Sequence, residues 1–403
     1  MAQDALEYRR VIGAPIGEAF RAFTRATPLR DWLCDVALAD ARPDGRLYLW
    51  WNRGYYTAGV FTAVEPNRHV AFTWLGRDEP SATHVEVWFE TLAGATEVRL
   101  VHRGLGEGEA WDRVRGDFDR GWERGLENLQ SLLETGEDLR YTRRPMLGVI
   151  LDDFNAEVAR ELGVPVAEGI RIAGTVPDMG AARAGLQPND VIVSMAGTAI
   201  PDFPSVVTAL QGRRAGDVVE VHVYRGAVLH TLSMALSSRA LPPIPPTTAL
   251  LAEERHQLIA PALSRLSALV EAMTPERAAF KPGPKEWSVL EIIAHMIVTE
   301  RDEQTWITDL INDDERFSDR YTNPSAVHAR VEALATVTGG GAPKLLAALK
   351  AAVAETEALI VALPAEFIAH RGSYWRLAHN LLQGDHHWQE HLCQIEQNLQ
   401  AAG

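Results

Sequence analysis

The chain has 403 residues, of which 46% are hydrophobic and 23% are charged, and its formal net charge is −15. This length predicts about two to four domains, and the acidic balance disfavours binding to nucleic acid or to an anionic membrane surface. The sequence has no apolar stretch long enough for a membrane span and no signal-peptide pattern. Cys34 and Cys393 are too few for a disulfide framework. We therefore expect a cytoplasmic multidomain protein.

The first segment, residues 1–140, predicts a sheet followed by a long helix. A strand pattern at residues 7–12 and a helix pattern at residues 16–23 open it, and an amphipathic helix at residues 111–135 closes it. Between them, apolar and polar residues alternate with a period of two, which predicts half-buried antiparallel strands. These stretches are residues 47–51, 56–63, 69–74, 84–90 and 96–102.

This segment resembles the START-like (SRPBCC) helix-grip family named for activators of the heat-shock ATPase. The resemblance lies in residues 14–24, residues 29–33, the run Phe72-Thr73-Trp74 and the pair Gly121-Trp122. It implies a sheet around a long helix, often with an apolar cavity that would bind an apolar small molecule. A filled core is the alternative, because a core of this size uses aromatic residues anyway. The candidate lining residues are Trp32, Trp50, Trp51, Trp74, Trp88 and Phe118.

The middle segment, residues 144–240, mixes short strands with helix patterns at residues 155–162 and 204–210. It contains the run Ala184-Gly185-Leu186-x-Pro188-x-Asp190-x-Ile192, which resembles a bacterial PDZ domain of the HtrA-protease type. Asn189 stands where that family usually has glycine, a mild change because asparagine tolerates a left-handed backbone. The predicted strands are residues 147–151, 170–176, 191–195, 218–224 and 228–236.

The PDZ resemblance implies a binding site for a C-terminal peptide or protein ligand. The run Met146-Leu147-Gly148-Val149 would be the carboxylate-binding loop, and the peptide would add a strand beside Val149. Val206 and Leu210 would line the pocket for the last side chain together with Leu147 and Val149. The alternative is a PDZ fold that serves only as a spacer or docking surface.

A proline-rich linker at residues 241–247 leads to a last segment, residues 248–403, in which every long pattern is helical. The predicted helices are residues 248–272, 288–312, 344–363 and 374–400. Four long apolar-striped helices favour an up-and-down bundle. The expected fold class is therefore multidomain α+β, with a helix-grip domain, a PDZ domain and an all-α four-helix bundle.

Three histidines of the last segment predict a divalent metal site. His387 and His391 lie four residues apart, a spacing that places two imidazoles on one helix face. His295 lies within an apolar stripe and should face the core, where a metal ion would satisfy it. The alternatives are a hydrogen-bonded core histidine and a solvated histidine pair. The doublet of His386 and His387 leaves the register open, and spacing favours His387.

Two runs of this segment resemble the signatures of the DinB-like superfamily. They are Trp287-Ser288-x-x-Glu291-x-x-x-His295 and His387-x-x-x-His391-x-x-Gln394-Ile395. The resemblance implies a metal-binding bundle with an open coordination position, with zinc or nickel as the ion.

Two functions are compatible with these three modules. The first is an adaptor or sensor that combines small-ligand, peptide and metal binding. The second is a metal-dependent enzyme of the thiol S-transferase or hydrolase type, as in characterised DinB-like relatives where a metal activates a thiol. For such an enzyme, Glu300, Glu390 and Tyr374 are candidate acid, base or thiol-binding groups, and no catalytic residue is assigned. The sequence leaves a homodimer open.

Overall fold

The computed structural model describes residues 5–52, 54–238, 241, 243–284, 286–315, 324–339 and 341–403. It divides into two compact units, one of residues 1–138 with 242–403 and one of residues 139–241. The linker predicted at residues 241–247 includes Pro242, which lies outside the described residues. Where the structure describes the chain, no helix is both long enough and apolar enough to cross a membrane.

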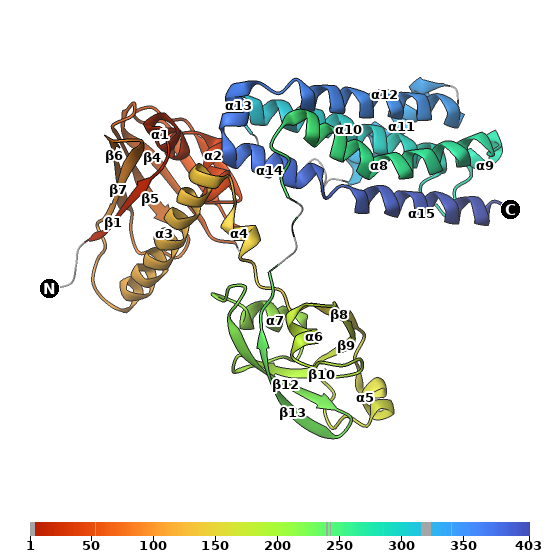
Figure 1. Cartoon of the computed structure of the whole chain (residues 1–403), viewed down its shortest axis with the longest axis horizontal. Helices are drawn as coiled ribbons and strands as arrows, with labels where there is room; N and C mark the ends of the chain where they lie inside the picture. Colours follow the sequence, from red (N-terminus) through yellow and green to blue (C-terminus); the bar gives the residue numbers. More distant parts are fainter. Residues whose placement is uncertain are drawn as a thin grey trace. The chain divides into compact units, whose positions relative to one another are not determined.

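The N-terminal domain is an antiparallel sheet of seven strands in the order β1-β7-β6-β5-β4-β3-β2, with the long helix α3 against it (Figure 1). Each buried face follows from the period-two alternation of the strands, because successive side chains point to opposite faces. In β6, Thr83, Val85, Val87 and Phe89 are buried whereas the residues between them are not. The elements are β1 Ala5–Ile12, α1 Ile16–Thr24, α2 Ala26–Trp32, β2 Val36–Ala39, β3 Arg46–Trp50, β4 Tyr56–Glu65, β5 His69–Gly76, β6 Thr83–Leu92, β7 Ala95–Arg103 and α3 Glu109–Thr135.

The core of this domain lies between the sheet and one face of α3. Phe118, Trp122, Leu126, Leu129 and Leu132 recur at three- and four-residue steps on that face, and all are buried in one cluster with the inward residues of the sheet. The helix α3 ends at Gly136, which adopts φ of +85° as a left-handed cap. The helix-grip arrangement predicted from the sequence is therefore present.

The second unit is a sheet-rich PDZ fold. Its strands follow the order β13-β12-β10-β9-β8, with β11 paired to β10, so that β8 lies at an edge. Asn189 has φ of +71°, the left-handed conformation that asparagine tolerates. The elements are α4 Leu139–Thr142, β8 Val149–Asp152, α5 Ala156–Leu162, β9 Ile170–Thr175, α6 Gly180–Arg183, β10 Val191–Met195, β11 Thr198–Ala199, α7 Phe203–Ala209, β12 Val218–Arg225 and β13 Val228–Ala235.

The C-terminal region is helical, with α8, α10 and α12 packed side by side and α15 against α8 and α10 (Figure 1). The helices are α8 Thr248–Glu271, α9 Pro275–Ala279, α10 Val289–Ile311, α11 Pro324–Thr338, α12 Gly341–Val361, α13 Ala365–Ala369, α14 Arg371–Leu381 and α15 Asp385–Ala401. Two details differ from the prediction. The helix expected at residues 374–400 is interrupted by a turn at residues 382–384, and the helices α9, α11 and α13 lie outside the predicted ranges.

The helical region and the N-terminal domain share a buried ion-pair cluster. Arg376 of α14 donates from Nε to Asp31 Oδ1 at 2.7 Å and from Nη1 to Glu315 Oε1 at 3.0 Å. Ser373 donates to Asp31 Oδ2 at 2.6 Å, and Arg30 lies 2.7 Å from Glu315. Asp31 and Glu315 are 5% and 3% exposed. Charges this deeply buried persist only when they are paired, so the cluster holds the two regions together.

Candidate metal centre

The first histidine of the centre is carried by a well-capped helix. Ser288 and Glu291 form a capping box at the start of α10, in which each side chain bonds the backbone N–H of the other residue. His295 follows one turn after Glu291 and is half-buried, between buried apolar neighbours on α10. The rigid first turn therefore fixes where the imidazole of His295 leaves the helix.

The other two histidines lie on α15. His387 and His391 are both half-buried, whereas His386 is exposed and lies 3.1 Å from the exposed Glu390. The structure thus brings His387, and not His386, toward His295. The helical period explains the difference, because adjacent residues are about 100° apart around the helix axis.

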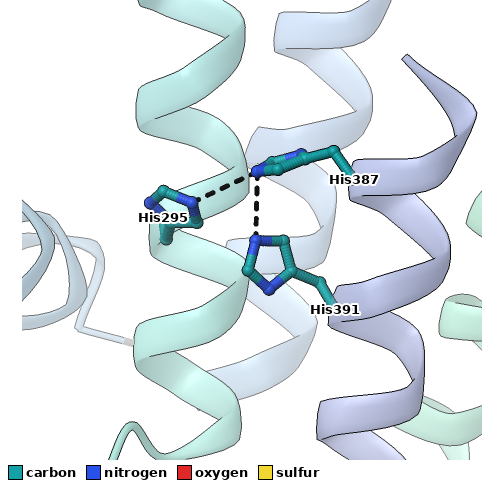
Figure 2. Close-up of side chains that lie close together, drawn as sticks. All are labelled: His295, His387 and His391. Carbon is teal, nitrogen blue, oxygen red and sulfur yellow. Dashed lines mark hydrogen bonds between the residues drawn. The ribbon is translucent and has the colours of Figure 1, made fainter. Parts of the chain in front are cut away.

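The three imidazoles converge on one point between α10 and α15 (Figure 2). The Nε2 atom of His387 lies 3.3 Å from Nε2 of His295 and 3.1 Å from Nε2 of His391. A tetrahedral ion with metal–nitrogen bonds of about 2.0–2.1 Å requires ligand atoms about 3.3–3.4 Å apart. The two separations measured from His387 are close to this value, and the ligand atoms of all three histidines lie within 4.8 Å of one another, as a shared ion requires.

The protonation state of the three rings also suits a cation. Burial, with a smaller effect from the neighbouring imidazoles, lowers the pKa of His295 to about 4 and that of His387 to about 4. Burial likewise lowers the pKa of His391, against the opposing effect of its hydrogen bond to Gln394. Neutral imidazole is the form that binds metal, so the rings need not lose protons near pH 7.

Within the described part of the chain, one other group of three candidate ligands has its ligand atoms within 4.8 Å of one another: Glu291, His328 and Glu332. There, however, Lys281 Nζ lies 2.6 Å from Glu291 Oε1, and the other Glu291 oxygen accepts from Ser288. An ammonium group already balances this carboxylate, which disfavours a second cation. The three-histidine group is thus the better candidate.

The acid, base and thiol-binding candidates suggested by the sequence have other contacts. Glu300 accepts hydrogen bonds from Arg255 at 2.8 Å and from Thr356 at 2.8 Å in the core. Tyr374 donates to the backbone oxygen of Pro245 at 2.9 Å. With Glu390 paired to His386, each of these groups has a structural partner that accounts for its position.

The predicted carboxylate-binding loop precedes the edge strand β8. Gly148 has φ of +77°, and a Cβ atom there would lie 2.3 Å from Met179 Cβ, so the loop requires glycine. Among the hydrogen bonds of the described residues, none is donated by the backbone N–H of Leu147 or Gly148. In the pocket predicted beside this loop, Leu147 and Val206 are buried and Val149 and Leu210 half-buried, whereas Met146 is 37% exposed.

The residues predicted to line a cavity in the N-terminal domain separate into two sets. Trp32, Trp74 and Phe118 are buried in the core, with the rings of Trp74 and Phe118 edge to face at 6.1 Å between centroids. Trp50 and Trp88 lie at strand positions that alternate with buried residues, and Trp88 stacks on His69 on the other face of the sheet. These two cannot share one interior cavity with the first set. Trp51 packs at the edge of the core.

Sequence reasoning did not identify a buried histidine in this core. His102 is fully buried, its Nδ1 accepts from Trp122 Nε1 at 3.0 Å, and its Nε2 lies 2.7 Å from Thr83 Oγ1. Burial, with a smaller effect from the nearby His84, lowers the pKa of His102 to about 3. The ring is neutral and both of its nitrogens are hydrogen-bonded, so it is part of the core rather than a metal ligand. The strand pattern at residues 96–102 could have identified His102, because His102 shares the buried face with every second residue of that strand.

Comparison with known proteins agrees with this description. Three family models match in chain order: the Activator of Hsp90 ATPase homolog 1-like protein at residues 13–134, the PDZ domain at 145–236 and the DinB superfamily at 259–395. The chain joins an Aha1-like, a PDZ and a DinB-like region. The DinB-like match includes all three histidines of the candidate centre.

The curated relatives are bacterial proteases of which this chain matches only a part. A probable periplasmic serine endoprotease DegP-like of Marinomonas sp. is 31% identical over 96 residues, 24% of this chain and 20% of the relative. A probable periplasmic serine protease do/HhoA-like of Haemophilus influenzae is 27% identical over 110 residues, 27% of this chain and 23% of the relative. The chain thus spans about a fifth of the length of these relatives.

Solved structures resemble about a third of the chain. The Aha1 dimer from Colwellia psychrerythraea is 20% identical, with a TM-score of 0.31 over 34% of this chain and 99% of that chain. An Hsp90 activator from Plasmodium falciparum is 23% identical, with a TM-score of 0.28 over 32% of this chain and 96% of that chain. Likenesses at this level carry no argument about function.

Proposed function

We propose that this protein binds one divalent metal ion through His295, His387 and His391 and combines it with peptide binding in an adaptor or sensor. The observation that carries the proposal is the approach of His387 Nε2 to the Nε2 atoms of both other rings, at 3.3 and 3.1 Å. Zinc or nickel is the proposed ion, because imidazole ligands suit metals of this type.

The adaptor interpretation rests on the PDZ region. The backbone N–H groups of Leu147 and Gly148, which donate to no described residue, would receive a C-terminal carboxylate, and the edge of β8 away from β9 would accept the peptide as an added strand. The side chains of Leu147, Val149, Val206 and Leu210 belong to one apolar cluster, so a pocket that they line would favour an apolar last residue. The N-terminal domain would supply the third module, and its buried aromatic residues Trp74 and Phe118 make the domain core the candidate region for an apolar small molecule.

A metal-dependent enzyme is the second candidate, because the centre has three protein ligands. Structural zinc sites usually have four protein ligands, whereas catalytic sites have three and leave one position for water or substrate. A bound cation at this position would lower the pKa of a coordinated thiol or water. The three imidazoles would hold the ion, and because they are neutral they would leave its charge of +2 uncompensated.

Metal analysis and a turnover assay test both candidates. The whole chain is dialysed, its metal content is measured by elemental analysis, and consumption of low-molecular-weight thiols in the presence of an electrophilic acceptor is followed with and without a chelator. Less than one tenth of an ion per chain after loading with zinc or nickel would refute the metal site. A stoichiometric ion without thiol consumption supports the adaptor, whereas chelator-sensitive consumption supports the enzyme.

A further inference from the structure

Helix α15 carries a polar stripe that continues beyond the two histidines. His387, His391, Gln394 and Asn398 follow one another at steps of four, three and four residues, the spacing of one helix face. The residues one position later form an apolar stripe of the same spacing that is buried in the core: Trp388, Leu392, Ile395 and Leu399. A polar stripe next to a buried apolar one is costly to desolvate unless its groups have partners.

Gln394 has a partner inside the metal centre. Its Oε1 atom lies 3.1 Å from Nδ1 of His391, one turn away on the same helix. An amide oxygen can only accept, so Nδ1 of His391 carries the proton. The neutral ring then has its free lone pair on Nε2, the atom that faces His387 at 3.1 Å. The contact therefore selects the tautomer that can bind a metal.

Asn398, on the same helix, contacts the residue that precedes α10. It is 3% exposed, and its Nδ2 atom donates to the backbone oxygen of Trp287 at 2.6 Å. Trp287 immediately precedes the capping box of α10, and its ring packs on the imidazole of His295 at 4.8 Å between centroids. Asn398 thus ties α15 to a residue whose ring contacts the imidazole of His295.

We propose that Gln394 and Asn398 are positioning residues of the metal centre, Gln394 for the tautomer and orientation of His391 and Asn398 for the packing of Trp287 on His295. This inference rests on the proposed metal binding. Partners of metal-binding histidines keep the ring in its binding orientation, and their loss typically lowers metal affinity about 10–100-fold. Neither residue would touch the ion itself.

The test compares full-length variants by zinc affinity, measured by competition with a chromophoric chelator, and by the visible spectrum of the cobalt-loaded protein. Gln394→Met keeps the length of the side chain and removes the acceptor, and we expect affinity to fall about 10–100-fold with altered cobalt bands. Gln394→Glu keeps an acceptor and should retain wild-type affinity or exceed it. Asn398→Leu should weaken binding about 10-fold. Gln397→Met, at an exposed position of the same helix, is the matched control and should change nothing.

The outcomes separate this inference from the proposed function. If the wild-type chain binds zinc and Gln394→Met binds it equally well with an unchanged cobalt spectrum, the role of Gln394 is overturned, and the same result for Asn398→Leu overturns its role. If the wild-type chain binds neither ion, the metal centre itself is refuted. Should Gln394→Met fail to fold, as judged by circular dichroism, Gln394→Ala takes its place.

Discussion

Replacing Arg376 by methionine should strongly destabilise the unit formed by the N-terminal domain and the helical region. The guanidinium lies between Asp31 and Glu315, with contacts of 2.7 and 3.0 Å. Burial alone would lower the pKa of Arg376, but the two carboxylates outweigh it and raise the pKa overall. Burial alone would raise the pKa of Glu315, but Arg376 and Arg30 outweigh it and lower the pKa overall. The substitution keeps the length of the side chain and leaves two buried carboxylates facing an apolar group.

The expected loss of unfolding free energy depends on which partners Asp31 and Glu315 keep after the substitution. Removing one partner of a buried ion pair costs about 3–5 kcal/mol, because an uncompensated charge stays buried. Arg30 still lies 2.7 Å from Glu315, and Ser373 still donates to Asp31 at 2.6 Å. We therefore expect the lower end, about 3 kcal/mol of unfolding free energy.

Urea unfolding followed by tryptophan fluorescence measures this loss. Arg301→Met, at an exposed position of α10, is the matched control and should shift the free energy by less than about 0.5 kcal/mol. Adding Asp31→Asn to Arg376→Met should recover part of the loss, since the uncompensated carboxylate of Asp31 is then removed while Glu315 keeps its ion pair with Arg30 at 2.7 Å. If Arg376→Met is no more destabilising than the control, the interface of the two regions is not formed as described.

Three further predictions concern the individual modules. His295→Ala or His391→Ala should each lower zinc occupancy after dialysis to a small fraction, as measured by elemental analysis, and full occupancy in both variants would contradict the three-ligand centre. Gly148→Glu should abolish binding of a fluorescent C-terminal peptide, because the new side chain meets Met179 and adds negative charge where the carboxylate would lie, and an unchanged titration would argue against that site. The buried His102 has a pKa of about 3 in the folded protein and 6.5 in the unfolded chain. Between these two pH values the unfolded chain binds more protons, so the free energy of unfolding decreases by up to about 1.4 kcal/mol for each unit by which the pH is lowered. This slope in urea unfolding should diminish in His102→Gln, and a slope that persists there would assign it to other groups.

Much of the local structure could be predicted from residue patterns alone. The period-two stretches became strands of the N-terminal sheet, and the apolar stripe of residues 111–135 became the buried face of α3. The predictions that were wrong also have local causes. Residues 374–400 were read as one helix, whereas a turn at 382–384, which contains the poor helix former Gly384, divides it. Trp88 was grouped with core aromatics, although it alternates with the buried Val87 and Phe89.

The sequence by itself determined which side chains share a helix or strand face, because that depends only on a period of 3.6 or 2 residues. It therefore placed His387 with His391, four residues apart. Only the tertiary structure decided that His295 meets His387 at 3.3 Å and that Asp31 and Arg376, 345 residues apart, form a buried pair. Such contacts depend on how whole elements pack, and no periodicity within one element records which partner its face will meet.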